Sequence, residues 1–421
     1  MPRLRAGLYQ SKIMNRSFLH LPKQLVQSLS SPLILFALLA WTYHLFDLYD
    51  WNQPFSKFLC FASIFVLVAF VSPEKETRPT AQLNFVELVA FSAIGCFLLW
   101  LYLPPISPYL VVPAEGDMGY TTQHAAEVFF RQFINPYSGQ VVINPSPDPT
   151  LQGYYYGPVM FMAYAGSAWL TEYGLKLHNL AYVILTATTV GLIVAHQIQD
   201  QPKVRRMTGI VAAIVAFLLP WRLWFEAFRR GAPDIFSTLT CLVSLLLIIR
   251  HRYKAAGIVL GLSLSSKLTP GVFVLIALFR LPLNKKLLFG LALGCLPLAV
   301  FASWDWQVLY RHMIEFQFTK PFDNTSIYDI SPPELHFVIH LAAPLVAAYC
   351  ILRYYKSSLK FEDVLRSTLL VMIVAEATFS EVHGNHLLWF FPFIAIYFGM
   401  IRQTFLRTVI VRLGLRAHDA G

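Results

Sequence analysis

The sequence predicts an all-α polytopic membrane protein. Of its 421 residues, 56% are hydrophobic and only 13% are charged, whereas an ordinary soluble protein carries about 25% charged residues. Apolar runs recur along the whole chain, and Lys and Arg gather in the short segments between them. A membrane helix needs about 20 mostly apolar residues, so this alternation indicates many crossings and not a soluble domain with one anchor.

The apolar runs define the expected crossings. They lie at residues 29–46, 58–72, 84–103, 177–196, 207–224, 234–250, 287–303, 335–352, 364–380 and 387–402. Between Lys254 and Lys285 two shorter arms flank "SSKLTPG", where Ser, Thr and Pro break the apolar pattern, which predicts a hairpin with Lys267 at its tip. We expect about 12 crossings, with residues 156–170 forming a short juxtamembrane or re-entrant helix that does not cross fully.

Basic loops predict the orientation of these helices. Segments such as "KVRR" (203–206), "RHRYK" (250–254) and "NKK" (284–286) should be cytoplasmic, together with both termini. We therefore expect an integral protein of the plasma (inner) membrane. The net charge of +10 is explained by these loops, and no basic patch interleaved with aromatic residues suggests nucleic-acid binding.

The first large external loop contains an expected amphipathic helix, within "AEGDMGYTTQHAAEVFFRQFINPY" (114–137). Wound as a helix, residues 117–133 carry Asp117, Tyr120 and His124 on one face and several Phe residues on the other. Such a helix can lie in the interface with its aromatic face in lipid. Two interpretations of Asp117 stay open: an N-terminal cap, or a carboxylate held at the bilayer surface beside a cavity.

Three further external features carry ionisable groups. Lys267 needs a partner near the bilayer, and a phosphate would supply one; the alternative is a lysine that snorkels to the interface. Arg229 and Arg230 offer planar donors suited to phosphate oxygens, or else contact headgroups or an acidic neighbour (Glu226 or Asp234). His383 and His386 suit hydrogen bonds to a phosphate or sugar, or a structural role, better than a metal site, because Asp and Cys are absent at ligand spacing.

These groups together suit a lipid-phosphate substrate. Cations would hold a departing phosphate, aromatic and amide groups would hold a sugar, and a carboxylate would take the proton from an attacking hydroxyl. The sequence has no GxGxxG, P-loop, GxSxG or HExxH motif to indicate another chemistry. A transporter or flippase of lipid-linked sugars is the alternative from another class, although no inverted repeat supports it. An acyl- or phosphotransferase with the same cationic pocket is a third.

The order of motifs resembles the GT-C superfamily of integral-membrane glycosyltransferases, and more narrowly glycosyltransferase family 87, which includes polyprenol-phosphate-mannose-dependent mannosyltransferases. The matching elements are "GDMGYTTQHAA...INPY", "YYYGP", "AGIVLGLSLSSKLTP" and "EVHGNHLLWFFP", with a looser match at "RRGAPD". Gly157 stands where the family's aromatic element has its first proline. The resemblance implies a catalytic core over 84–402, preceded by a cytoplasmic N-terminus with two additional helices (1–83) and followed by a cytoplasmic tail (403–421).

The resemblance also implies an activity: inverting transfer of a hexose, with mannose the first expectation, from a polyprenyl-phosphate-linked donor. The acceptor would be a hydroxyl of a glycolipid, glycan or protein on the non-cytoplasmic face. Asp117 matches the family's general base and Lys267 would bind the donor phosphate. No metal cofactor is implied, although the superfamily leaves open a metal held by Glu115 and Asp117. The other expected substrate contacts are Arg229, Arg230, His383, His386, His124, Tyr120 and Tyr156.

Overall fold

The computed structural model describes residues 117–138, 142–143, 154–170, 174–201, 203–218, 220–278, 284–315, 328, 331–354, 361–378 and 386–412. Every element within these ranges is a helix, in agreement with the predicted all-α class. In chain order they are α5 (Asp117–Gln132), α6 (Pro158–Ala163), η2 (Ala165–Ala168), α7 (Gly174–Gln197), α8 (Lys203–Leu218), α9 (Trp221–Trp224), η3 (Phe225–Arg229), α10 (Asp234–Ile249), α11 (Tyr253–Leu264), α12 (Leu268–Leu278), α13 (Lys285–Gly294), α14 (Leu296–Tyr310), η4 (Arg311–Glu315), α17 (Pro333–Tyr354), α18 (Phe361–Ala377) and α19 (Leu387–Arg412).

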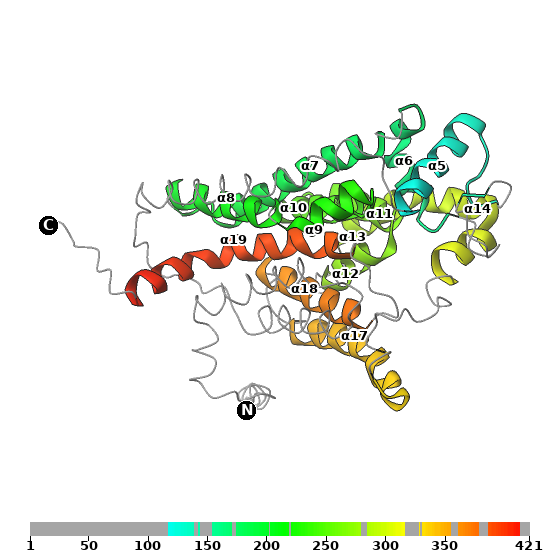
Figure 1. The fold of residues 1–421 in the computed structure, drawn as a ribbon. Helices are drawn as coiled ribbons and strands as arrows, with labels where there is room; N and C mark the ends of the chain where they lie inside the picture. The colour runs from blue at the N-terminus through cyan, green and yellow to red at the C-terminus, as the bar shows by residue number, and fades with distance from the viewer. Residues whose placement is uncertain are drawn as a thin grey trace, which may run out of the picture.

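The helices form an elongated bundle with α19 running along its length (Figure 1). Helix α19 packs against α7, α8 and α10 on one side and against α18 on the other. Helix α11 lies between α10 and α13; α12 contacts α10, α11 and α18, and α17 packs mainly on α18. Helices α5, α6 and α14 gather at one end (Figure 1). The starts of α10 and α19 lie toward that same end, where the polar side chains described below converge.

One helix within the described ranges, α7, is both long and apolar enough to cross a membrane; it has 24 residues. Helices α13 and α14–η4 meet the same criterion as a pair, but they are bent by 48° at the break near Cys295. The sequence predicted one continuous run over 287–303, and Pro297, within the first turn of α14, helps to explain why the helix restarts there. The total of about 12 crossings stays a prediction, because the runs at 29–46, 58–72 and 84–103 lie outside the described residues.

The segment 156–170 folds as predicted into short pieces. Helix α6 has six residues and η2 has four, whereas a crossing needs about 20. The hairpin around Lys267 is also confirmed, since α11 ends at Leu264 and α12 begins at Leu268.

Much of the aromatic face of α5 packs on protein, whereas Phe133 just beyond the helix is 84% exposed. The rings of Phe129 and Phe161 lie 5.2 Å apart, and those of Phe129 and Phe301 lie 5.5 Å apart. Ala125 and Ala126 are fully buried in the same cluster. The helix predicted over 117–133 is therefore confirmed, but its apolar face joins α5 to α6 and α14. Periodicity identifies an apolar face without identifying what covers it.

Helices α11 and α13 touch through their backbones. A Cβ atom added at Gly257 would lie 2.1 Å from the carbonyl oxygen of Leu287, and one added at Gly290 would lie 2.1 Å from that of Lys254. Gly261 and Gly294 meet in the same way one turn along. Small residues spaced four apart allow this close approach between helices. The two glycines of "AGIVLGLSLSSKLTP" thus fix the first arm of the hairpin that carries Lys267.

Candidate anion-binding site

Asp234 is the first residue of α10 and is completely buried. It follows a tight turn after the π-helical segment η3, in which Gly231 has a φ of 67°. The amide of Ala232 donates to the carbonyl of Glu226 at 2.9 Å and closes this turn. A carboxylate in the first helical turn is favoured by the helix dipole, which partly offsets the cost of burying it.

Two polar side chains from neighbouring elements hold this turn in position. Asn179 of α7 donates to the carbonyls of Ala227 at 2.6 Å and Ala232 at 3.2 Å. The hydroxyl of Tyr164 donates to Asn179 at 2.5 Å and lies 3.3 Å from the carbonyl of Pro233. The backbone that leads into Asp234 is thereby fixed from outside its own helix, so the direction of the carboxylate is well determined.

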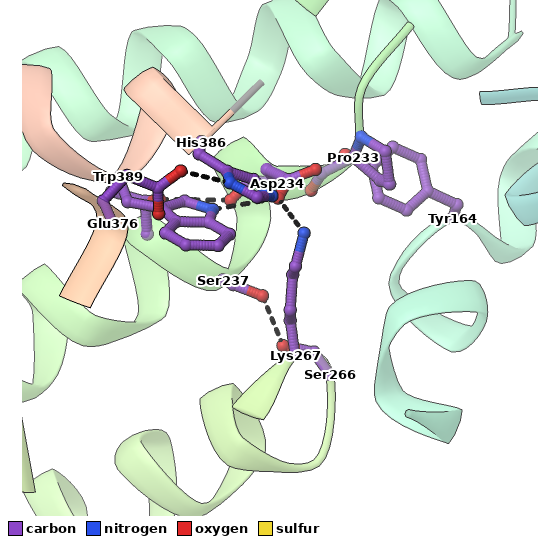
Figure 2. Close-up of polar contacts among 10 residues, drawn as sticks. Tyr164, Pro233, Asp234, Ser237, Ser266, Lys267, Glu376, His386 and Trp389 are labelled. Atoms are coloured by element: carbon purple, nitrogen blue, oxygen red, sulfur yellow. Dashed lines mark hydrogen bonds and ion pairs between the residues drawn. The ribbon is translucent and has the colours of Figure 1, made fainter. Parts of the chain in front are cut away.

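Lys267 faces Asp234 from the tip of the hairpin (Figure 2). Its ammonium nitrogen, Nζ, lies 2.5 Å from Oδ1 of Asp234. Hydrogen bonds among three serines, here called the serine ladder, fix the hairpin along α10. The hydroxyls of Ser237 and Ser266 lie 2.7 Å apart, and Ser263 donates to the carbonyl of Ser237 at 3.0 Å. The contact therefore joins α10 to a hairpin that follows it in the chain.

Two aromatic rings surround the ammonium group. Nζ of Lys267 lies 4.7 Å from the ring centroid of Trp389 and 5.0 Å from that of Tyr156, both within the range of cation–π attraction. The indole of Trp389 also donates to Oδ1 of Asp234 at 2.9 Å. Trp389 lies in the first turn of α19, so α10, α19 and the hairpin all meet at one carboxylate oxygen.

The backbone around Tyr156 is tied directly to the hairpin. The amide of Gly157 donates to the carbonyl of Ser266 at 2.8 Å, and a Cβ at residue 157 would lie 2.1 Å from the carbonyl oxygen of Ser265. On the other side, Tyr137 donates to the carbonyl of Tyr156 at 2.5 Å. Proline would not fit at position 157, since it has no amide hydrogen to donate and its ring would have no room.

A second acid–base pair lies next to the first. Nδ1 of His386 donates a short hydrogen bond to Oε1 of Glu376, which is fully buried at the end of α18. The His386 ring stacks on Trp389 with centroids 4.3 Å apart. Figure 2 shows both pairs on either side of this indole. Glu376 orients the imidazole through this bond, in the way that carboxylates orient functional histidines.

The two carboxylate oxygens of Asp234 differ in their hydrogen bonding, and Asp234 is more deeply buried than Lys267. Oδ1 of Asp234 accepts from two donors, whereas Oδ2 is buried and accepts no hydrogen bond from any described residue. The Lys267 side chain keeps 14% of its surface exposed. Burial of a carboxylate with an unsatisfied oxygen costs free energy. Lys267 is the more exposed member of the pair, because the Asp234 side chain is fully buried.

The structure brings together three of the residues expected from sequence: Lys267, Tyr156 and His386. Asp117 is the first residue of α5, and its side chain lies outside the described part. A Cβ added at Gly119 would lie 2.9 Å from the carbonyl oxygen of Gly231. The start of α5 therefore packs on the turn that leads into Asp234.

The other expected residues are arranged differently. Arg230 forms an ion pair of 3.8 Å with Glu226 and, like Arg229, approaches the ring of Phe225; for Arg230 this is the salt-bridge alternative. His124 lies 3.6 Å from Glu127 and stacks on Tyr120, which is 55% exposed. These two residues are on the outer face of α5. His383 lies outside the described residues.

Sequence reasoning underestimated Asp234, Glu376 and Trp389. Asp234 was considered only as a partner for arginine, and Glu376 was included in an apolar run without comment. Asp234 and Glu376 are acidic residues near the ends of runs otherwise typical of membrane helices, and ionisable groups in such runs often mark function. Nothing in the sequence, however, pairs residues 234 and 267.

Among the described residues, no three His, Cys, Asp or Glu side chains gather as metal ligands would. Glu115, the other half of the metal pair considered above, is outside these residues. No protein-family model matches this chain, and no curated protein or solved structure matches it. Function is therefore inferred from the chemistry of the site and from the motif resemblance.

Proposed function

We propose that this protein is an integral-membrane glycosyltransferase that moves a hexose, mannose foremost, from a polyprenyl-phosphate donor to an acceptor hydroxyl with inversion. The observation that carries the proposal is the ammonium of Lys267, which lies between the rings of Trp389 and Tyr156 beside the starts of α5 and α10. A cation, aromatic faces and polar groups at one point are what a phosphate-linked sugar requires.

Each group has a role in this proposal. Lys267 binds the donor phosphate and stabilises the charge that develops as the sugar departs. Tyr156 and Trp389 offer apolar ring faces to the sugar. Asp117, at the start of α5, acts as the general base that deprotonates the acceptor hydroxyl. The packing of Gly119 on Gly231 supports a short path between that helix start and the Lys267 site.

The topology is part of the same proposal. We propose about 12 crossings, both termini in the cytoplasm, a plasma (inner) membrane location and a site at the non-cytoplasmic leaflet. The test is the labelling of single cysteines at positions 117 and 267 with a membrane-impermeant thiol reagent, in a background without the five native cysteines. Labelling of both from the non-cytoplasmic side is expected. Labelling from opposite sides contradicts the shared site.

The activity is tested with the purified full-length protein and a radiolabelled polyprenyl-phosphate-mannose donor. Asp117→Asn should lower the rate about 10²–10⁴-fold, the usual cost of losing a general base. Asp200→Asn is the matched control, because Asp200 is exposed beyond the far end of α7. Full activity of Asp117→Asn contradicts the base assignment. Flipping of donor lipid across vesicles without any transfer product favours a transporter instead.

A further inference from the structure

We propose that Asp234 is a positioning residue that tunes the Lys267 site toward singly charged phosphodiesters and against doubly charged phosphate monoesters. This inference rests on the proposed function, because it assumes that Lys267 binds a lipid phosphate. It assigns a role to a carboxylate that the sequence pattern offers only as an acidic neighbour of Arg229 and Arg230.

The geometry places Asp234 within reach of any anion bound by Lys267. Nζ of Lys267 lies 2.5 Å from Oδ1 of Asp234, and a phosphate oxygen bonded to an ammonium lies at about 2.8 Å. The phosphate oxygen is therefore no farther than about 5.3 Å from the carboxylate, by addition of these two lengths. Displacement of the carboxylate is opposed by the Trp389 hydrogen bond and by the turn held by Asn179.

The surroundings give this proximity a strong electrostatic effect. Asp234 is fully buried, and its Oδ2 accepts no hydrogen bond within the described part of the chain. Water therefore screens the carboxylate poorly, and charges about 5 Å apart at a protein site interact by several times more than in bulk water. An anion at Lys267 meets an attractive ammonium and a repulsive carboxylate together.

The attraction from Lys267 and the repulsion from Asp234 add up differently for the donor phosphodiester and for the product phosphate monoester. A polyprenyl-phosphate sugar is a phosphodiester with one negative charge, whereas a phosphate monoester carries about −1.5 to −2 at neutral pH. In the proposed transfer, the acceptor oxygen forms a bond to the anomeric carbon while the bond from that carbon to the phosphate oxygen breaks. The electron pair stays on the phosphate, and the acceptor proton goes to the base. Repulsion from Asp234 consequently grows as the lipid product forms, which favours its release.

The serine ladder and the rings of Tyr156 and Trp389 hold Lys267 in a constant position relative to Asp234. Ser237 and Ser266 fix the hairpin to α10 at 2.7 Å, so Lys267 does not move away from Asp234 when an anion enters. Tyr156 and Trp389 limit the directions in which the ammonium can turn. Asp234 therefore acts in two ways. It holds Lys267 in place, and its negative charge limits how much anionic charge Lys267 can neutralise.

The test compares two lipid anions of similar shape by titration calorimetry in detergent: farnesyl phosphate, mostly doubly charged, and farnesyl methylphosphonate, singly charged. The wild-type protein should bind the methylphosphonate at least as tightly as the phosphate. Asp234→Asn keeps the acceptor oxygen for Lys267 and Trp389 but removes the charge. In this variant the preference for farnesyl phosphate over the methylphosphonate should rise at least about tenfold, and Asp234→Glu should restore the wild-type ratio.

Each outcome bears on the proposal. A wild-type protein that already prefers farnesyl phosphate tenfold, or an Asp234→Asn variant with an unchanged ratio, overturns it while leaving the transferase proposal intact. A changed ratio in a protein that transfers no sugar supports Asp234 and contradicts the transferase. Failure of the wild-type protein to bind either probe overturns both. The wild-type comparison needs no variant, so the proposal is testable even if Asp234→Asn does not fold; Asp200→Asn should keep the wild-type ratio.

Discussion

Replacing Lys267 by methionine should destabilise the folded protein because it leaves the carboxylate of Asp234 buried without its cation. Asp234 has no exposed surface and an unsatisfied Oδ2, so little solvent can compensate for the loss. Removing one member of a buried ion pair costs about 3–5 kcal/mol. Trp389 still donates to Oδ1 in the variant, so we expect the lower end, about 3 kcal/mol.

A double-mutant cycle separates this effect from simple loss of contacts. Asp234→Asn alone should cost less than Lys267→Met, because the Lys267 side chain keeps 14% exposure and can reach water. The double variant removes both charges and should return to within about 1 kcal/mol of the wild type. The assay is the free energy of unfolding of each protein in the same detergent. A double variant as unstable as the sum of the singles refutes the reasoning, because independent sites add.

Three other predictions follow from close contacts. Gly290→Ala should destabilise by about 1–3 kcal/mol through overpacking, because its Cβ would meet the Lys254 carbonyl oxygen at 2.1 Å. In Gly191→Ala the nearest atoms belong to the side chains of Ile214, at 3.1 Å, and Ile210, at 3.4 Å, so this variant should lose less stability. Thermal melts of both variants test this, and equal losses contradict it. Gly157→Pro should lower both stability and donor binding, since it removes the donor to Ser266; an unaffected melting temperature shows that this contact is unimportant. Burial raises the pKa of Tyr137 well above 10, so the neutral phenol is favoured in the folded state. The stabilisation that comes from this pKa difference is fully present below pH 10 and is lost as pH rises above the pKa of Tyr137 in the unfolded state. In a pH series, the melting temperature should therefore decline less steeply for Tyr137→Phe than for the wild type. An equal decline in the two proteins contradicts this prediction.

Within the described residues, most expected apolar runs coincide with helices, because burial of an apolar face favours a helix whatever that face packs against. The hairpin at Lys267, the helix from Asp117 and the short pieces over 156–170 all follow from local chemistry: caps, breaks and length. The apolar run over 287–303 did not predict the break at Cys295, although Pro297 in the first turn of α14 is a local signal for a helix start. The apolar face of α5 follows from periodicity, whereas the packing of Phe129 on Phe161 and Phe301 does not.

The site was only partly predictable, for a related reason. Sequence spacing shows which residues share a helix face but not how two helices are rotated against each other. Asp234 and Lys267 are 33 residues apart and meet because α10 packs on α11, with the serine ladder joining the two elements. Lys267 was identified because a lone ammonium in an apolar arm is conspicuous. Asp234 was overlooked because two arginines stood next to it.

The glycine contact between α11 and α13 has a consequence for how the protein can vary. Where two main chains touch, no side chain remains to absorb a change in spacing, so one helix cannot slide along the other by a fraction of a turn. The first arm of the Lys267 hairpin is accordingly fixed against α13. Sequence changes that alter helix spacing must be absorbed elsewhere, on surfaces where side chains can still exchange volume.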